Sequence, residues 1–338
     1  MTQQPQPADP QPQGTAISFT ILPSHTPLIP MSTAIETDDL TKKYGPVTAV
    51  DGLSLRVMRG EIYAFLGLNG SGKTTTIRML LGMVRPTAGE ARVLGASIRG
   101  RGERPWRAVG YLVETANAYP ELTVRENLEV MRRLRPGTEA KAVDRTIERL
   151  GLLPYADRRA GALSLGNAQR LGIAKSLLHN PKLLILDEPA NGLDPAGIVE
   201  VRKLLIELAQ ERGVTVFMSS HILGEVSRLA KRIGIIHQGR LLQELDVDEL
   251  ERNRQQRLLI RTRDSQAALA LLLDAGFAAE MTADGAVAIK DAAAIAAPDD
   301  IAARLVHANQ SPTLLAVEQE DLEQYFLRLV GVEAGTTR

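Results

Sequence analysis

The stretch that decides the fold is Gly67-Leu68-Asn69-Gly70-Ser71-Gly72-Lys73-Thr74, which matches the pattern G-x-x-x-x-G-K-[ST]. The apolar residues 62–66 before it predict a strand, and residues 73–83 predict a helix after it. Its glycines allow successive backbone N–H groups to turn toward a phosphate, and the start of the helix adds partial positive charge. We expect Lys73 to reach the β- and γ-phosphates of a nucleotide, and the Thr74 hydroxyl to bind Mg²⁺. The alternative is a glycine-rich turn that only caps a helix.

A second run, Leu183-Leu184-Ile185-Leu186-Asp187-Glu188, is an apolar strand that ends in two acids. In a parallel sheet this end of a strand faces the ligand crevice. Asp187 is suited to hold a metal ion, directly or through water, and Glu188 to polarise a water for in-line attack on the γ-phosphate. Alone, the two acids would equally well end a strand and cap the turn before Pro189. The nearby phosphate loop favours the functional interpretation.

The composition limits the classes of protein to consider. A chain of 338 residues suggests two domains at roughly 150 residues each. Forty basic residues balance forty acidic ones, which argues against a dedicated nucleic-acid binder. The absence of cysteine excludes disulfides, thiolate metal sites and cysteine nucleophiles. No run of about 18 apolar residues and no secretory signal is seen, so we expect a soluble, cytoplasmic chain without a membrane span.

Three segments are predicted along the chain. Residues 1–33 are rich in proline and glutamine and are expected to be a disordered tail. Residues 34–245 alternate short β-rich runs with helical patterns, which predicts an α/β domain built on a largely parallel sheet. Residues 246–338 are expected to be an α+β accessory domain. The strands and helices expected in the α/β domain are strands 50–57, 61–66, 91–94, 183–186 and 214–219, and helices 73–83, 124–152 and 195–212.

The accessory segment has a readable order of elements. A charged helical stretch at 246–256 marks the boundary. Strand 257–262, helix 265–275, a hairpin of 278–281 and 286–290, helix 298–308 and strand 313–317 then follow. This order, βαββαβ, predicts a ferredoxin-like unit, followed by an amphipathic helix at 321–330.

The two motifs, with the segment between them, resemble the nucleotide-binding subunit of ATP-binding cassette (ABC) transporters over about residues 34–239. The segment Leu163-Ser164-Leu165-Gly166-Asn167-Ala168-Gln169-Arg170 is similar to the family signature LSGGQ, with Leu165 for the first glycine and Asn167 for the glutamine. As an isolated string it would equally well be an ordinary helix N-cap. The resemblance implies a P-loop NTPase cassette, with a RecA-like core, an antiparallel β subdomain and a helical subdomain, joined to the small ferredoxin-like domain.

The resemblance also implies roles for individual residues. Tyr44 would stack on adenine, although an ordinary half-buried tyrosine is the alternative. Asp194 would belong to the loop that connects two nucleotide sites, and His221 would contact the γ-phosphate, whereas His179 and His237 are expected to contact backbone or solvent. Lys73, Glu188 and His221 are the catalytic candidates. The residues implied to bind ATP are Tyr44, Asn69, Gly70, Ser71, Gly72, Lys73, Thr74, Thr75, Ser164, Gly166, Asn167 and Asp194.

One position departs from the family pattern. Glu114 stands where most members carry a glutamine that touches Mg²⁺ and the attacking water. The implied metal ligands are therefore Thr74, Asp187 and Glu114, and the coupling to a membrane partner is put in doubt. Glu114 and the stretch 119–128 resemble the bacitracin-export and lantibiotic-immunity branch. Loop 116–122 would receive the coupling helix of a permease.

The resulting hypothesis is an ATPase subunit at the cytoplasmic face of the membrane that powers export through a separately encoded permease. Two copies would pair head to tail around two ATP molecules, with Mg²⁺, and no nucleic acid is expected as a partner. A soluble ABC ATPase that acts on nucleic acid or ribosomes is the alternative. A third possibility is a non-catalytic regulatory role of residues 257–330, for which we expect self-association or docking. The exported substrate cannot be read from this chain, since selectivity would lie in the permease.

Overall fold

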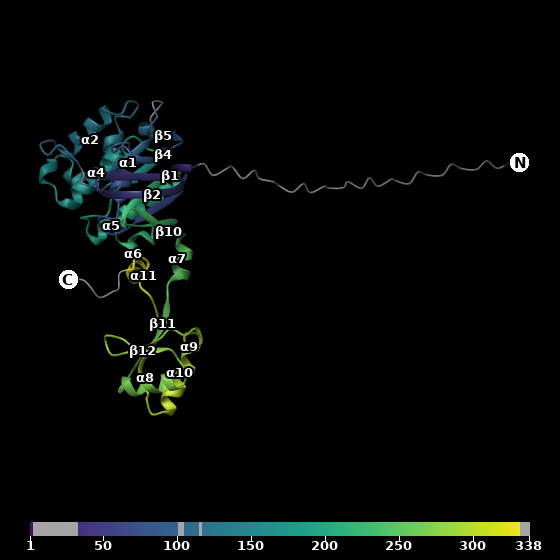
Figure 1. Cartoon of the computed structure of the whole chain (residues 1–338). Coiled ribbons are helices and arrows are strands. Elements are labelled where there is room, and N and C mark those ends of the chain that lie inside the picture. Colours follow the sequence, from purple (N-terminus) through teal and green to yellow (C-terminus); the bar gives the residue numbers. More distant parts are fainter. Residues whose placement is uncertain (3–32, 101–104, 115–116, 332–338) are drawn as a thin grey trace. The chain divides into compact units, whose positions relative to one another are not determined.

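The computed structural model describes residues 1–2, 33–100, 105–114 and 117–331 (Figure 1). The chain divides into two units, Met1–Met31 and Ser32–Arg338. Nearly all of the predicted tail, residues 1–33, lies outside the described residues. Among the helices that are described, none is both long and apolar enough to cross a membrane.

A six-stranded sheet lies at the centre of the second unit, in the order β10-β9-β3-β8-β7-β6. All neighbours are parallel except β10, which runs antiparallel to β9. The register places Leu66, the last residue of β3, opposite Ser220 of β8, so these strands end at the same edge. The bounds are β3 (Ile62–Leu66), β6 (Val109–Leu112), β7 (Leu183–Leu186), β8 (Thr215–Ser220), β9 (Arg232–His237) and β10 (Arg240–Asp246).

A second sheet is antiparallel, in the order β2-β1-β4-β5. Its strands are β1 (Thr33–Tyr44), β2 (Val47–Met58), β4 (Ala88–Val93) and β5 (Ala96–Ser97). The expected strands at 50–57 and 91–94 correspond to parts of β2 and β4. This sheet is the antiparallel β subdomain that the sequence implied.

The helices of this region differ from the predicted ones mainly in their ends. Helix α1 (Lys73–Leu80) stops before residue 83, because Gly82 has a φ of 69°. The helical stretch predicted at 124–152 is two helices, which are separated near Gly137, at a φ of 88°. Thr123 and Glu126 form the capping box that the sequence predicted. The remaining bounds are α2 (Val124–Arg133), α3 (Ala142–Arg149), α4 (Leu165–Leu177), α5 (Pro195–Arg212) and α6 (Leu223–Val226), with single 3₁₀ turns at Pro105–Ala108, Leu153–Tyr155 and Ala160–Ala162.

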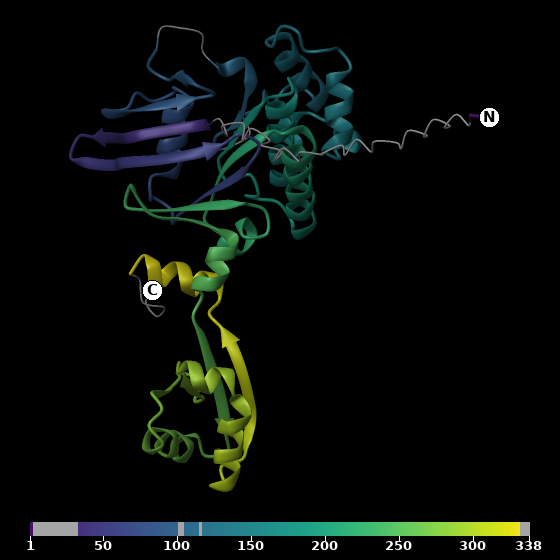
Figure 2. The same ribbon diagram turned by 90° about the vertical axis from the view of Figure 1, so that its right-hand side faces the viewer.

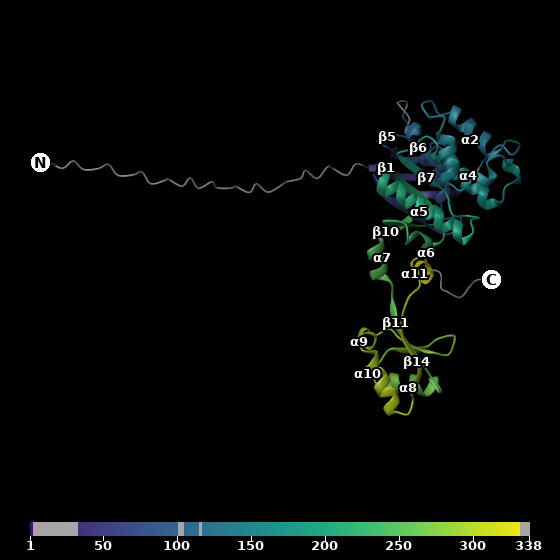
Figure 3. The same cartoon turned by 180° about the vertical axis from the view of Figure 1, so that it is seen from behind.

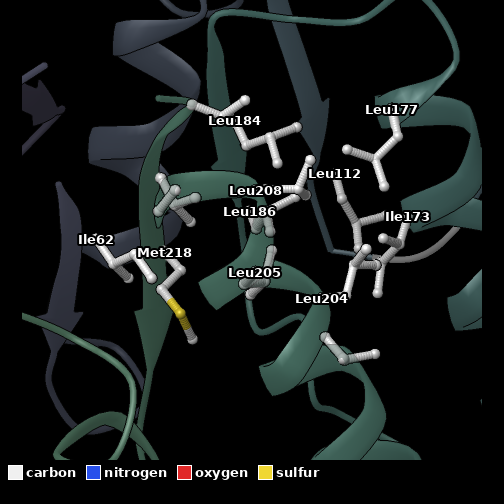
Figure 4. Close-up of a cluster of buried hydrophobic side chains, with 14 of the residues drawn as sticks. Ile62, Leu112, Ile173, Leu177, Leu184, Leu186, Leu204, Leu205, Leu208 and Met218 are labelled. Atoms are coloured by element: carbon white, nitrogen blue, oxygen red, sulfur yellow. The ribbon is translucent and has the colours of Figure 1, made fainter. Parts of the chain in front are cut away.

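Two apolar cores cover the two faces of the central sheet. Ile62 and Leu66 of β3 face what we call the central core, where they are joined by leucines of α4 and α5 such as Leu177 and Leu205 (Figure 4). Tyr63 and Phe65 face the other core, which includes α1 and the antiparallel sheet. Every side chain of β3 and β7 is buried, as expected for inner strands of a parallel sheet. The ends of β3, β7 and β8 are therefore held rigidly from both sides.

The accessory segment contains the predicted ferredoxin-like sheet. Its strands have the order β12-β13-β11-β14 and are all antiparallel; β11 and the edge strand β14 are the two longest and lie side by side (Figure 2). Leu258, Ile260, Val287 and Ile289 pack against its helices in a separate core. The elements are α7 (Val247–Asn253), β11 (Gln256–Thr262), α8 (Ser265–Asp274), β12 (Ala279–Met281), β13 (Val287–Ile289), α9 (Ala292–Ala296), α10 (Pro298–His307), β14 (Pro312–Gln319) and α11 (Leu322–Leu329). Helix α9 was not predicted.

The last helix, α11, belongs to a different core from the strands that precede it. Its residues Tyr325 and Phe326 are buried in the central core. Helix α11 lies beside α6 (Figure 3). The apolar face predicted for 321–330 is therefore real. The domain division at residue 246 stays a prediction.

Candidate functional site

The candidate site lies where β3, β7 and β8 end, and its first component is the loop between β3 and α1. Gly72 is the N-cap of α1 and has a φ of 108°, which L side chains rarely adopt. A Cβ on Gly72 would lie 2.5 Å from the carbonyl oxygen of Ala49. A Cβ on Gly67 would lie 2.4 Å from Ser71 Oγ. The loop therefore requires glycine at both positions, as expected for backbone that closes around a phosphate.

Lys73 is buried inside this loop. Its Nζ donates hydrogen bonds to the carbonyl oxygens of Gly67 (2.6 Å) and Leu68 (3.2 Å). Nζ also lies 3.4 Å from Glu188 Oε1. The buried hydroxyl of Ser71 has no hydrogen-bond partner among the described residues. A buried cation beside a buried polar atom without a partner fits a loop that receives the oxygen atoms of a ligand.

Thr74 and Asp187 meet at the start of α1. Thr74 Oγ1 donates to Asp187 Oδ2 at 2.7 Å, and Ser219 Oγ donates to Asp187 Oδ1 at 2.5 Å. Asp187 is 1% exposed, so both carboxylate oxygens are held in place. Ser219 was not singled out from the sequence. Its position directly before Ser220-His221, at the end of an apolar strand, was the signal that could have identified it.

Glu188 is the second acid, and its backbone is unusual. It has a φ of 49°, a left-handed conformation that is uncommon for a residue other than glycine. Its backbone N–H donates to Ser219 Oγ at 3.0 Å, and its Oε2 lies 2.8 Å from His221 Nδ1. Backbone strain of this kind tends to occur at functional sites. The structure thus brings together the predicted residues Lys73, Thr74, Asp187, Glu188 and His221.

The signature segment forms a separate cluster at the start of α4. Ser164 is the N-cap of α4, and its hydroxyl accepts a hydrogen bond from Asn167 N at 3.3 Å. Asp194 caps α5 in the same way, through Gly197 N at 2.9 Å. Gly166 lies against Gly192, since a Cβ on it would be 3.2 Å from the Gly192 carbonyl oxygen. Within the described ranges, none of these side chains makes a hydrogen bond or ion pair with the phosphate loop of the same chain.

Gln169 connects this cluster to the acid pair. It is 4% exposed, and its Nε2 donates to the carbonyl oxygens of Glu188 (3.1 Å) and Pro189 (3.2 Å). The position of α4 is therefore coupled to the strained turn after β7. Gln169 belongs to the signature segment, but the sequence predicts no role for it, because its partner is a backbone segment that only the fold brings close.

Three other predicted ATP contacts are open to solvent. Tyr44, at the end of β1, is 45% exposed, and Lys42 Nζ lies 4.8 Å from the centre of its ring. Asn69 and Gly70 form the exposed tip of the phosphate loop, and Thr75 is half-buried in the first turn of α1. Tyr44 thus offers a free aromatic face for a planar ring.

Glu114 does not join the other predicted metal ligands. Its Oε1 pairs with Arg78 at 2.5 Å, its φ is 60°, and its side chain is 56% exposed. A cavity of about 370 Å³ adjoins it and is lined by Lys175 and His179. Burial lowers the pKa of both groups, and for His179 the nearby Arg135 adds to the effect. His179 Nε2 lies 3.1 Å from a backbone oxygen, as expected.

The loop predicted to face a permease lies beside this cavity, and only its residues 117–122 are described. The side-chain amide of Asn127 holds this loop through hydrogen bonds to its backbone. Asn127 Nδ2 donates to Tyr119 O at 3.0 Å, and Tyr119 N donates to Asn127 Oδ1 at 2.8 Å.

Thr74 and Asp187 fit a magnesium ion whose other ligands are water and phosphate oxygens. Across the described part of the chain, no group of three or more His, Cys, Asp or Glu side chains could form a metal cage. Thr74 and Asp187 offer two hard oxygen atoms next to the phosphate loop. Mg²⁺ characteristically takes one or two protein oxygens and completes its shell with water and phosphate.

Known proteins are similar to this chain in sequence and in fold. The profile of the family described as "ABC transporter" matches residues 50–191. The bacitracin transport ATP-binding protein BcrA of Bacillus licheniformis is 40% identical over 304 residues, which are 89% of this chain and 98% of that protein. The lantibiotic transport ATP-binding protein SrtF of Streptococcus pyogenes is 38% identical over 217 residues, 64% of this chain and 93% of that protein. A solved dimeric cassette in a post-hydrolysis state, bound to ADP and Pi, is similar with a TM-score of 0.58 and 25% identity, over 63% of this chain and 98% of that one.

Proposed function

The chain belongs to the ABC transporter family as an ATP-hydrolysing subunit of an exporter, and we propose that it works with a separate membrane permease at the cytoplasmic face of the membrane. The similarity to BcrA over nearly the whole length of that protein supports this assignment. BcrA and SrtF also confirm the predicted resemblance to the bacitracin and lantibiotic branch. We propose a peptide-like antibiotic as the exported substrate.

The observation that carries the proposal is the convergence of one cation, two acids and one imidazole at the ends of three strands. Among the residues that the structure describes, Lys73 Nζ donates hydrogen bonds only to loop carbonyls and lies near Glu188, so it can exchange these partners for the oxygens of the β- and γ-phosphates. Thr74 and Asp187 would hold Mg²⁺, which when bound neutralises charge on the phosphate oxygens. Tyr44 would stack on adenine, with Asn69 to Thr75 enclosing the phosphates.

Glu188 is proposed as the general base. Its carboxylate would accept a proton from water as the water oxygen bonds to the γ-phosphorus and the bond to the β,γ-bridging oxygen breaks. ADP leaves with the electron pair of that bond. His221 Nδ1–H would donate to Glu188 Oε2, which lies 2.8 Å away, and so orient the carboxylate. Ser219 fixes both the backbone of Glu188 and the carboxylate of Asp187.

A second copy is proposed to complete each site. Ser164, Gly166 and Asn167 lie at the start of α4, where the helix dipole favours an anion. Because they do not contact the phosphate loop of their own chain in the described residues, they are available to cap the γ-phosphate bound to a partner copy. Asp194 would lie between the two sites. The dimeric relative bound to ADP and Pi supports this pairing.

The alternative, an ATPase acting on nucleic acid or ribosomes, has less support. The net charge of the chain is zero, whereas a nucleic-acid surface would need a clustered excess of Lys and Arg. BcrA and SrtF are both named as transport proteins.

The proposal is tested by Glu188→Gln, with Glu211→Gln at the exposed end of α5 as the matched control. Glu188→Gln should reduce ATP turnover by about 10²–10⁴-fold, the usual contribution of a general base, and should accumulate an ATP-bound dimer. Glu211→Gln should change neither. Turnover and dimer content are measured by phosphate release and by size-exclusion chromatography with ATP. Normal turnover in Glu188→Gln would remove Glu188 as the base, and failure of the chain to co-purify with any membrane protein would contradict the permease.

A further inference from the structure

The final helix of the chain packs on the segment that carries His221. Helix α6 begins two residues after His221 and has only four residues. Its side chains Leu223 and Val226 are buried in the central core, to which Tyr325 and Phe326 of α11 also belong. Helices α6 and α11 are in contact (Figure 3). An isolated helix of one turn is not stable in water, so its position depends on what packs against it. Helix α11 therefore helps to fix where α6 begins.

The placement of His221 depends on this support. The His221 side chain is 43% exposed, and its one hydrogen bond to a described residue is the contact with Glu188. His221 lies in the short segment between β8 and α6, so the backbone there sets where the ring can reach Glu188. A shift at the start of α6 would move His221 away from Glu188.

A second contact connects α11 to the phosphate loop. Tyr325 Oη donates to Gln243 Oε1 of β10 at 3.2 Å. The turn that leads into β10 contains Gly239, whose N–H donates to Ser71 O at 2.9 Å. Helix α11 thus touches two elements, α6 and β10, and the segment just before each of them contacts the proposed ATP site, through His221 and Gly239.

The start of α11 is anchored at the base of the ferredoxin-like sheet. Glu320 N donates to Gln255 O at 2.7 Å, and Gln255 N donates to Glu320 Oε2 at 3.0 Å. Arg328 donates to both carboxylate oxygens of Glu320 at 2.8 Å. We call Gln255, Glu320 and Arg328 the junction. Through it, α11 is fixed at one end to the accessory sheet and packs with its apolar face against α6.

We propose that Tyr325 and Phe326 are positioning residues of the ATPase, which hold α6 so that His221 meets Glu188. The accessory sheet is then connected to the catalytic machinery through the junction and α11. This inference deepens the proposed function and rests on the role proposed there for His221.

The kinetic test is a double-mutant cycle between Phe326 and His221 in the full chain. Phe326→Ala should lower kcat for ATP by about tenfold, because a displacement of about 1 Å at a catalytic group suffices for such a loss, and should leave KM within about twofold. In a His221→Ala background, Phe326→Ala should cause no further loss. Phe326→Leu, which keeps an apolar side chain, should restore most of kcat.

The matched control is Leu305→Ala, a fully buried position in the core of the ferredoxin-like sheet. It makes a comparable cavity away from α6 and should leave kcat unchanged. The proposal is overturned if Leu305→Ala and Phe326→Ala lower kcat equally. It is also overturned if the loss from Phe326→Ala is as large without His221 as with it.

A spectroscopic test does not depend on turnover. The chain has five histidines, so the imidazole NMR signal of His221 can be assigned by its disappearance in His221→Ala. In folded Phe326→Ala this signal should move while that of His307, on α10, stays in place. A fixed His221 signal would refute the contact itself. A moved signal, together with normal kcat in His221→Ala, would leave the contact intact and refute the proposed role of His221 instead.

Discussion

Ser219→Ala is expected to be among the most damaging small substitutions in the chain. Ser219 is fully buried, donates a 2.5 Å hydrogen bond to Asp187 Oδ1 and accepts a 3.0 Å bond from Glu188 N. Alanine can make neither bond. The substitution leaves a carboxylate oxygen and a backbone N–H, both in the interior, with one partner fewer.

The size of the effect follows from these two bonds. A hydrogen bond to a charged group contributes about 1.5–3 kcal/mol, and a neutral one about 1 kcal/mol. We expect a loss of about 3 kcal/mol in the free energy of unfolding, a large share of the 5–15 kcal/mol that is typical of a domain. In an Asp187→Asn background the loss should shrink to about 1 kcal/mol, because the charge has been removed. Urea unfolding followed by the fluorescence of Trp106, the single tryptophan, measures both values.

Ser176→Ala is the matched control. Ser176 is also buried, but its hydroxyl donates only to the Ile173 carbonyl oxygen within its own helix, at 2.7 Å. Its loss should be about 1 kcal/mol. If Ser219→Ala and Ser176→Ala lowered the free energy of unfolding equally, the contact of Ser219 with the acid pair would contribute no more than an ordinary hydrogen bond.

Three further predictions concern the loop, the junction and the departure at position 114. Gly72→Ala forces a Cβ into a backbone contact at positive φ, so ATP affinity should be lost and stability reduced by about 1–3 kcal/mol; normal ATP binding in a calorimeter would contradict this. The hydrogen bond from Arg328 holds the pKa of Glu320 below its usual value, so its stabilisation is present above about pH 4.3 and is lost as the pH falls through the lower, folded-state pKa. In urea unfolding, the free energy of unfolding of the wild type should therefore exceed that of Glu320→Gln at pH 7 but not at pH 3. A difference that is the same at both pH values would exclude the mechanism. Glu114→Gln breaks an exposed pair with Arg78 and should change the free energy of unfolding by less than about 1 kcal/mol; a larger loss in the same assay would mean that the pair does more than a surface ion pair.

The parts of the site that the sequence predicted are those that depend on local order. The phosphate loop, the acid pair and His221 each follow an apolar strand within a few residues, so their positions at the sheet edge follow from the parallel arrangement. The roles of Ser219 and Gln169 could not be predicted, because the fold alone brings their partners close: β8 lies next to β7, and α4 packs near the turn after β7. Glu114 was grouped with the metal ligands by resemblance, whereas in the structure it pairs with Arg78.

The parts of the fold that the sequence predicted are likewise those that depend on local sequence patterns. Strand periodicity predicted the ferredoxin-like order, and capping residues predicted where α2 begins. The break between α2 and α3 coincides with Pro136-Gly137, a turn signal that lies inside the stretch 124–152 predicted as helical. The apolar face of α11 was also predicted. Which core it joins was not, because amphipathic spacing specifies a face but not a partner.

The junction has a consequence for how this chain can be rebuilt. Gln255 and Glu320 are bonded backbone to backbone, so the ferredoxin-like sheet enters and leaves the remaining structure at one point. A unit with adjacent ends can be excised and replaced by a short turn, or exchanged for a foreign ligand-binding domain, without lengthening the path to α11. The ferredoxin-like sheet with its helices is in this sense an insertion between α7 and α11 rather than an appended tail. A ligand-binding domain could be inserted in its place.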